Sequence, residues 1–311
     1  MLDAIPKAVF HAIAGSKSLD TLASRYGMAR PDGFARRFIA GENVEEAIET
    51  ARALQARGMA LTLDHLGESV TTLDEADRAT RAYLDVMRRV VASGIERNIS
   101  LKLSQLGLDI DRAVCTDNLR RILGAAGKDG FFVRVDMEAS ATVQPTLDIF
   151  TTLWQQDYRG VGVALQAALY RSEDDLTRMN AMGARVRLVK GAYKEPRTVA
   201  HQKKIDVDAA YGRMMERLLD RGTYPAIATH DSALIDGARR HASSHGIPTD
   251  RFEFQMLYGV RRDLQASLVA DGCRVRVYVP FGRQWFPYYM RRLGERPANV
   301  GFVLRALLRE G

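Results

Sequence analysis

Two short runs of alternating residues decide the fold: Ile99-Ser-Leu-Lys-Leu103 and Phe132-Val-Arg-Val-Asp136. In both runs apolar side chains occupy every second position and polar side chains lie between them, which is the period of a β-strand. The residues that separate the runs are enough for one helix and two loops. The pair therefore predicts one β-α-β unit.

The same unit repeats along the chain. Six further runs have strand character, and successive runs lie about 20 to 45 residues apart. Eight units in one series favour a closed parallel barrel over an open sheet, so we predict an α/β protein with a (β/α)8 TIM barrel as one domain over residues 1–311. The other runs are Ala60-Leu-Thr-Leu-Asp64, Val161–Gln166, Arg185–Val189, Ala226–His230, Phe252–Gln255 and Arg274–Tyr278.

Residues 1–55 have a different pattern. Asn43 to Leu54 has helical spacing between Gly41 and Gly58, which are typical helix boundaries. We expect an N-terminal helical arm here, in addition to the barrel. Its helices are candidates for contacts between subunits, so a homo-oligomer remains open.

Composition narrows the choice of partners. The chain has 45 basic and 38 acidic residues, a formal charge of +7, but no Lys/Arg tract interleaved with aromatics, so we expect no nucleic acid. Small anionic ligands, or peripheral contact with an anionic membrane surface, fit better. No secretory signal or membrane span is expected, and the two cysteines have no CxxC spacing, so the cytoplasm is predicted. A non-enzymatic adaptor for membrane surfaces is an alternative of another class.

The polar positions of the strands predict the inside of the barrel. Helices cover the outer face, so apolar side chains such as Val133 and Val135 must point outward and the polar ones into the lumen. Burying so many charges without partners or ligand groups costs about several kcal/mol each, which favours a ligand site over a structural ion network. The inward polar residues near the strand ends are Asp64, Lys102, Asp136, Gln166, Arg187, His230, Gln255 and Tyr278.

The stretch Arg187-Leu-Val-Lys-Gly-Ala-Tyr193 ends the fifth strand. Gly191 and Ala192 carry little bulk, so the backbone can approach a flat ligand closely. Arg187 supplies a fixed cation suited to an electron-rich ring nitrogen. Lys190 leaves a second class open, a Schiff-base aldolase, which would require an apolar pocket around the lysine.

Two histidines, His65 and His230, follow strand runs, where barrel enzymes often carry metal ligands. The sequence contains no His-x-His pair, and the fourth and fifth strands end in Gln166 and in Lys190-Gly191. We therefore expect no metal at the mouth, and a zinc hydrolase is disfavoured. A histidine bonded to the backbone is the alternative interpretation of His230.

The segment after the eighth strand predicts a carboxylate clamp. Pro287 suits the first turn of a helix, and Tyr288, Arg291, Arg292 and Glu295 then share one helix face. Two adjacent guanidiniums can bind a carboxylate, and Glu295 can hold them in place. We expect this final helix to lie over the barrel mouth.

Seven motifs follow one another along the strand ends and the final helix. They are Ser100-Leu-Lys-Leu-Ser104, Val135-Asp-Met-Glu138, Arg187–Tyr193, Ala228-Thr-His230, Phe252-Glu-Phe-Gln-Met-Leu-Tyr-Gly259, Val277-Tyr-Val-Pro-Phe-Gly282 and Tyr288-Tyr-Met-Arg-Arg292. In this order they resemble the proline dehydrogenase family, above all its short monofunctional bacterial members. The resemblance covers nearly the whole chain and is weakest over the first 50 residues or so. Asp231 stands where many relatives have asparagine, and Phe281 where tyrosine is frequent.

The resemblance implies a distorted barrel that binds FAD without a covalent link. Asp136 and Arg187 would be catalytic, with Arg187 near the flavin N5. The substrate carboxylate would bind to Lys102, Arg291 and Arg292. The implied walls of the proline pocket are Leu257, Tyr278 and Tyr288, and the implied cofactor contacts are Met137, Gln166, Arg187, Lys190, Gly191, Ala192, Thr229 and His230.

The resemblance also implies the reaction. L-proline would lose a hydride from C5 to the flavin N5 and become Δ1-pyrroline-5-carboxylate, the first step of proline catabolism. Electrons would pass on to a quinone, which gives the basic surface a role at the inner face of the cell membrane. The residues themselves do not identify the group that takes the proton from the amine.

Overall fold

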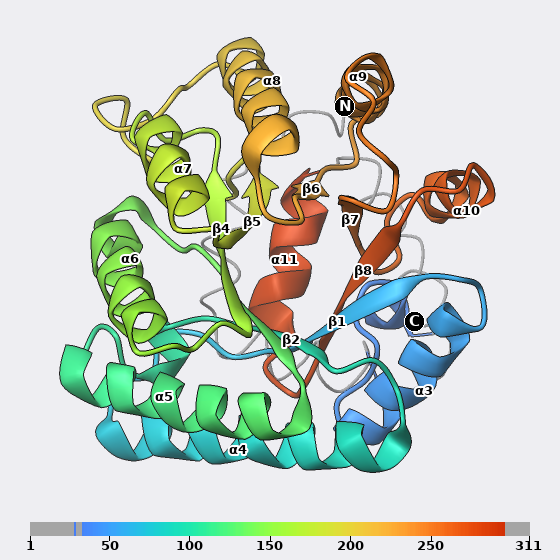
Figure 1. Ribbon diagram of the computed structural model, residues 1–311. Coiled ribbons are helices and arrows are strands. Elements are labelled where there is room, and N and C mark those ends of the chain that lie inside the picture. The colour runs from blue at the N-terminus through green and yellow to red at the C-terminus, as the bar shows by residue number, and fades with distance from the viewer. Residues whose placement is uncertain (1–27, 29–32, 296–311) are drawn as a thin grey trace, which may run out of the picture.

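The eight predicted strands form a closed parallel barrel in which each strand pairs with the next and β8 pairs with β1 (Figure 1). The computed structural model describes Met28 and residues 33–295, so most of the predicted N-terminal arm lies outside the described residues. The strands are β1 Ala60–His65, β2 Asn98–Leu101, β3 Phe132–Val135, β4 Val161–Gln166, β5 Arg185–Val189, β6 Ala226–Ala228, β7 Glu253–Leu257 and β8 Val275–Phe281.

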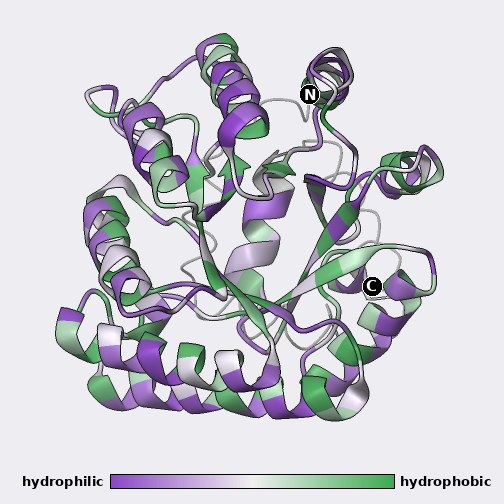
Figure 2. Cartoon of the chain, viewed as in Figure 1, coloured by the Kyte–Doolittle hydropathy of each residue, from purple (hydrophilic) through white to green (hydrophobic). Residues whose placement is uncertain are grey.

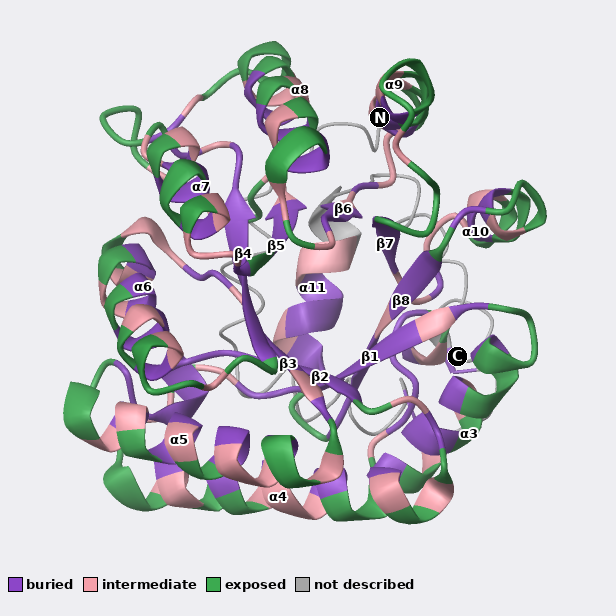
Figure 3. Ribbon diagram, viewed as in Figure 1, coloured by how far each residue is buried: buried purple, intermediate pink, exposed green. Residues whose placement is uncertain are grey.

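Helices surround this barrel and hold it through their apolar faces. Figure 2 shows apolar stripes on the helices, and Figure 3 shows that the strands and the inward helix faces are buried. Val133, Val135 and Leu101 are fully buried, as expected for strand residues that point toward the helices. The helices are η1 Phe34–Arg37, α3 Val44–Gln55, α4 Leu73–Ser93, η2 Ser104–Leu106, α5 Arg112–Asp129, α6 Ser140–Gln155, α7 Ser172–Ala181, α8 Lys204–Arg221, α9 Ser232–Ser244, α10 Arg262–Ala270 and α11 Phe286–Glu295.

The barrel departs from the regular arrangement at its closing seam. β1 and β8 pair over the whole length of β1, from Ala60 opposite Arg276 to His65 opposite Phe281. The helix that packs against this seam is α3, which precedes β1. The helix that follows β8 is α11. Its Arg291 binds Glu68, which lies just after the carboxyl end of β1, so α11 lies at the barrel mouth as predicted.

Several strand ends differ from the predicted ones. β2 stops before Lys102, β3 stops before Asp136, and β6 stops before Thr229 and His230, whereas β7 extends to Leu257. The side chains of Lys102 and Asp136 bond to one another and to other side chains at the mouth, although the Asp136 N–H still donates to the Leu101 carbonyl at 2.8 Å. Sequence alternation continues through these residues and for that reason overestimates the strand length.

The described helices include none that is both long and apolar enough to cross a lipid bilayer.

Candidate functional site

The site is built around Lys102, which follows β2 at the carboxyl end of the barrel. Its Nζ lies 3.3 Å from Asp64 Oδ2, 3.9 Å from Asp136 Oδ2 and 3.5 Å from the Tyr278 hydroxyl. Burial disfavours the charge of this lysine, but Asp64 and Asp136 outweigh it and raise the pKa of Lys102 above the usual value. The lysine is therefore a buried cation held by two carboxylates.

Asp136 joins this lysine to Arg187. The Tyr278 hydroxyl donates to Asp136 Oδ2 at 2.8 Å, and the Arg187 guanidinium binds the other carboxylate oxygen. Arg187 also donates to Ser100 Oγ at 2.9 Å and to Gln255 Oε1 at 2.6 Å. Residues on or next to β2, β3, β7 and β8 therefore fix a guanidinium that projects from β5.

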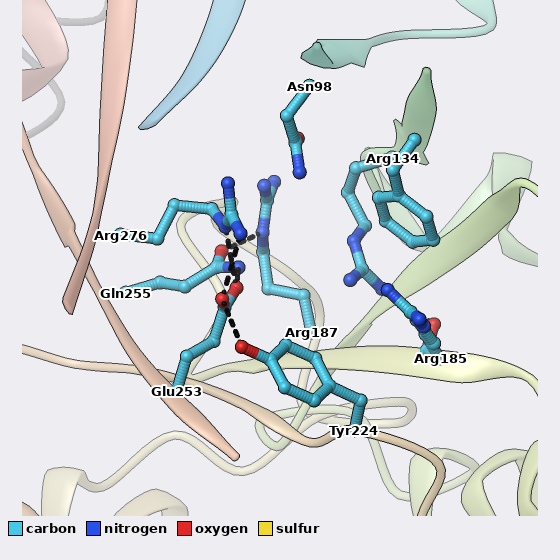
Figure 4. Close-up of a pocket in the computed structure, with 9 residues that line it drawn as sticks. Asn98, Arg134, Arg185, Arg187, Tyr224, Glu253, Gln255 and Arg276 are labelled. Atoms are coloured by element: carbon cyan, nitrogen blue, oxygen red, sulfur yellow. Dashed lines mark hydrogen bonds and ion pairs between the residues drawn. The ribbon is translucent and has the colours of Figure 1, made fainter. Parts of the chain in front are cut away.

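The lumen below Arg187 is also polar, and it continues the same network (Figure 4). Gln255 donates to Glu253 Oε1 at 2.5 Å, and Arg276 forms a bidentate pair with Glu253 at 2.8 and 3.0 Å. Arg276 also binds Glu96 at 2.6 Å. The hydrogen-bonded chain thus runs from the bottom of the barrel to Asp136 at the mouth. A small cavity in this region is lined by Asn98, Phe132, Arg134, Arg185, Arg187, Tyr224, Glu253, Gln255 and Arg276.

The structure gives Arg291, one of the two arginines of the predicted clamp on α11, a partner that the sequence did not indicate. Arg291 forms a bidentate pair with Glu68, with N–O distances of 2.9 and 2.5 Å. The partner predicted from the sequence, Glu295, has a side chain outside the described part of the chain. The guanidinium carbons of Arg291 and Arg292 lie 6.0 and 5.1 Å from the ring centre of Tyr288.

Glu68 connects the clamp to the lumen. It is one of the carboxylates that raise the pKa of Lys102, and it also raises the pKa of Arg291 against the opposing effect of burial. The α11 arginine and the β2 lysine therefore lie in one electrostatic environment. Sequence reasoning missed Glu68, although its place three residues after β1 would have suggested a position at the mouth.

Lys190 does not have the surroundings of a Schiff-base lysine. Its Nζ lies 2.5 Å from Asp208 and 2.9 Å from Asp231. The hydrogen bond from Lys190 lowers the pKa of Asp231 to about 2, so the carboxylate is charged at neutral pH. Asp231 also caps α9 by accepting from the Ala233 N–H at 3.1 Å. This lysine is tied into ion pairs, whereas the aldolase alternative required a desolvating apolar pocket.

The loop after Lys190 leaves an open main-chain surface at the mouth. Gly191 has φ +112°, which favours glycine, and a Cβ there would lie 3.2 Å from the Ala168 Cβ. Gly191 and Ala192 are exposed. Beside them, Gln166 donates to the Glu138 carbonyl at 3.1 Å and to the Met137 carbonyl at 3.4 Å. The Gln166 Oε1 is buried and has no hydrogen-bond partner within the described structure.

The remaining predicted contacts lie around this surface but outside the charged cluster. His230 Nε2 accepts from the Leu257 N–H at 2.9 Å, so this histidine is bonded to the backbone. Thr229 is buried, and its hydroxyl accepts from the Asp231 N–H at 3.1 Å. An unpaired acceptor, a close-approach glycine and a buried guanidinium together fit a flat polar cofactor.

Comparisons with known proteins agree with this geometry. Residues 47–305 match the family model described as proline dehydrogenase. The chain is 39% identical to proline dehydrogenase 2 of Bacillus subtilis (strain 168), over 98% of this chain and all of that protein. It is also 39% identical to the proline dehydrogenase of Deinococcus radiodurans, over 99% of this chain and all of that protein.

Solved structures of other proteins share this fold. The structure of proline utilization A from Bdellovibrio bacteriovorus, inactivated by N-propargylglycine, has a TM-score of 0.81 at 23% identity, over 93% of this chain and 38% of that one. Proline utilization A of Bradyrhizobium japonicum, in its D779W variant, has a TM-score of 0.72 at 24% identity, over 83% and 30% of the two chains. These likenesses show that the barrel is shared. From the match over most of its length and the relatives at 39% identity, the chain belongs to the proline dehydrogenase family and is an oxidoreductase that acts on proline.

Proposed function

We propose that this enzyme uses FAD to oxidise L-proline to Δ1-pyrroline-5-carboxylate. The reaction removes one hydride from C5 and one proton from the ring nitrogen, and a C=N bond forms. The observation that carries the proposal is the arrangement of fixed cations at one mouth: Glu68 acts on both Lys102 and Arg291, and Arg187 is bound to Asp136 deeper in the lumen.

The carboxylate of proline would bind to Lys102, Arg291 and Arg292. Glu68 uses one N–H on each terminal nitrogen of Arg291, so this guanidinium keeps further donors for a second carboxylate. The two arginines approach Tyr288, and Lys102 approaches Tyr278, so these tyrosines and Leu257 would surround the ring of the substrate. Binding by fixed charges would orient C5 before the reaction.

The isoalloxazine ring of FAD would be held by Arg187, the Lys190–Ala192 loop, Met137, Gln166, Thr229 and His230. When bound, the flavin supplies the acceptor for the hydride from C5, at its N5. The partners of the Arg187 guanidinium fix it on three sides, so it would stabilise negative charge on the ring without moving. Asp136 accepts hydrogen bonds on both oxygens, and we propose that it orients Arg187 and Lys102.

We further propose that the electrons leave to a quinone and that the enzyme works in the cytoplasm, at the inner face of the membrane. The net charge of +7 supports contact with anionic lipids. Sedimentation with vesicles of anionic lipid should carry the enzyme down at low salt and release it at high salt. If neutral vesicles carry down the same fraction of the enzyme as anionic vesicles, contact with anionic lipid is contradicted.

The clamp gives the most specific test of the substrate. Arg292→Met should retain the flavin but raise the KM for proline by roughly 30-fold or more, since an unpaired carboxylate costs about 2 kcal/mol or more. Arg57→Met, which replaces an exposed arginine in the turn between α3 and β1, is the matched control and should leave KM unchanged. The same KM in Arg292→Met and in the unmodified enzyme would refute the clamp.

A further inference from the structure

A group of metal-binding side chains lies away from the mouth, where α8 and α9 end. Asp220 is in the last turn of α8, His241 is in the last turn of α9, and His245 is the residue that caps the end of α9. The two helices pack side by side (Figure 1). In a β/α barrel the helices end opposite the mouth, so this group is remote from the proline site.

The three side chains bring one potential ligand atom each close together. His241 and His245 are four residues apart, on the same helix face, and their ring centres lie 4.1 Å apart. The Asp220 carboxylate lies 2.7 Å from His241 Nε2. One ligand atom from each residue falls within 4.8 Å of the others. A tetrahedral metal ion places its ligand atoms about 3.3 Å apart, so a modest rotation of the exposed His245 ring would complete the site.

The local structure holds the second ring near this geometry. His245 Nδ1 lies 2.9 Å from the His241 carbonyl oxygen, and a carbonyl can only accept. The Nδ1 therefore carries the proton in this contact, and the other ring nitrogen carries the lone pair. A hydrogen bond from one ring nitrogen to the backbone is the usual support of a metal-binding histidine.

The electrostatic surroundings favour a cation. Two helices present their carboxyl ends here, and the exposed carbonyls of each end carry partial negative charge. Asp220 adds a full negative charge. Of the basic residues on these turns, Arg239 is paired with Asp271 at 2.9 Å, and Arg221 and Arg240 are exposed to solvent, which screens their charge. A divalent ion would replace the hydrogen bond between His241 and Asp220 with stronger bonds to both.

We propose that Asp220, His241 and His245 bind a divalent transition-metal ion of the Zn²⁺ class. Two imidazoles and one carboxylate are ligands typical of Zn²⁺, and water would take the fourth position. The ion would join the ends of α8 and α9, which the hydrogen bond between His241 and Asp220 already connects. Its role would be structural, and it is independent of the reaction proposed above.

The experiment is a calorimetric titration of Zn²⁺ into the flavin-loaded enzyme without a histidine tag. One equivalent should bind, and Zn²⁺ should raise the melting temperature. His245→Ala should weaken binding by about tenfold or more and abolish the stabilisation. His245 is exposed, so this variant should fold and reduce its flavin with proline normally.

The matched control is His201→Ala, which removes a histidine that packs against Tyr170 and belongs to neither site. It should bind Zn²⁺ like the unmodified enzyme. Equal Zn²⁺ affinity in the unmodified enzyme and in His245→Ala, or no binding by either, would overturn the proposal. Neither outcome would affect the proline reaction, so the two hypotheses can fail separately.

Discussion

Arg187 joins the hydrogen-bonded side chains at the bottom of the barrel to Asp136 at the mouth. Gln255 accepts from its Nε and donates to Glu253, so the glutamine amide fixes both neighbours in one orientation. This buried link could not be predicted from the alternation of the strands. Alternation indicated which residues point inward, but the choice of partner depends on the register between β5 and β7, which are not neighbours in the barrel.

Replacement of Gln255 tests this link. Gln255→Leu leaves a buried donor on Arg187 without an acceptor, which costs about 1–3 kcal/mol of stability. It should also lower kcat more than it raises KM, because in the proposed function Arg187 would contact the flavin ring whereas the clamp is untouched. Urea unfolding and steady-state kinetics measure the two effects. A change in KM alone would contradict the role given to Arg187.

Glu68 gives a second prediction at this scale. Glu68→Gln keeps the size of the side chain but removes the charge that orients Arg291. We expect a KM for proline several-fold higher, with flavin content unchanged. Glu216→Gln, at an exposed position on α8, is the control. If the two variants show the same KM, Glu68 does not position the clamp.

The charge of Lys102 predicts a pH dependence. Asp64 and Asp136 raise the pKa of its ammonium above the usual value, so the protonated form persists where a free lysine has begun to lose its proton. The ion pairs of Lys102 therefore contribute fully to the stability of the folded enzyme below the ordinary lysine pKa. This contribution is lost only as the pH rises through the raised pKa of Lys102 in the folded state. The inhibition constant of cyclopentanecarboxylate, which has no amine of its own, should stay flat from about pH 7 to pH 10. Weakening across that range would place the lysine pKa at or below its usual value.

At the scale of elements, sequence alternation located all eight strands, and it failed mainly at their carboxyl ends. β6 is only three residues long, because Thr229 and His230 turn away to bond with the loop that leads into α9 and with β7. Glu68 was missed for a related reason. It lies in a loop without periodicity, so only its distance from the end of β1 could have indicated it.

β4 gives a prediction for a whole strand. A Cβ on Gly162 would lie 2.5 Å from the Arg185 carbonyl oxygen and 2.6 Å from the Arg134 guanidinium, so Gly162→Ala should cost about 1–3 kcal/mol through overpacking. Gly127→Ala is the matched control. That glycine lies inside α5 with open space around its Cβ, and the change should stabilise the protein by about 0.5–1 kcal/mol. The melting temperature should fall in Gly162→Ala and rise in Gly127→Ala. Equal shifts of the melting temperature in the two variants would contradict the packing described for β4.

At the scale of the molecule, the barrel and the charged mouth were predictable, and the arrangement at the seam was not. The pattern of residues 43–54 predicted a helix, but nothing in it indicated that this helix would pack on β1 and β8. α3 can cover the outer face of β1 and β8 because α11, the helix that follows β8, lies over the mouth and not on the outside of the barrel. α11 is held there by a buried apolar cluster that includes Leu66 and Tyr289 and by the pairing of Arg291 with Glu68, and both join residues that lie far apart in the chain.

In the proposed function, proline bound at this mouth reduces a flavin next to Arg187. The most direct measurement is the visible spectrum of the purified enzyme without oxygen, before and after L-proline is added. We predict the absorption bands of oxidised flavin before the addition and their bleaching after it, with Arg292→Met bleaching only at much higher proline concentration. A protein without these bands, or bands that proline leaves unchanged, would contradict the account.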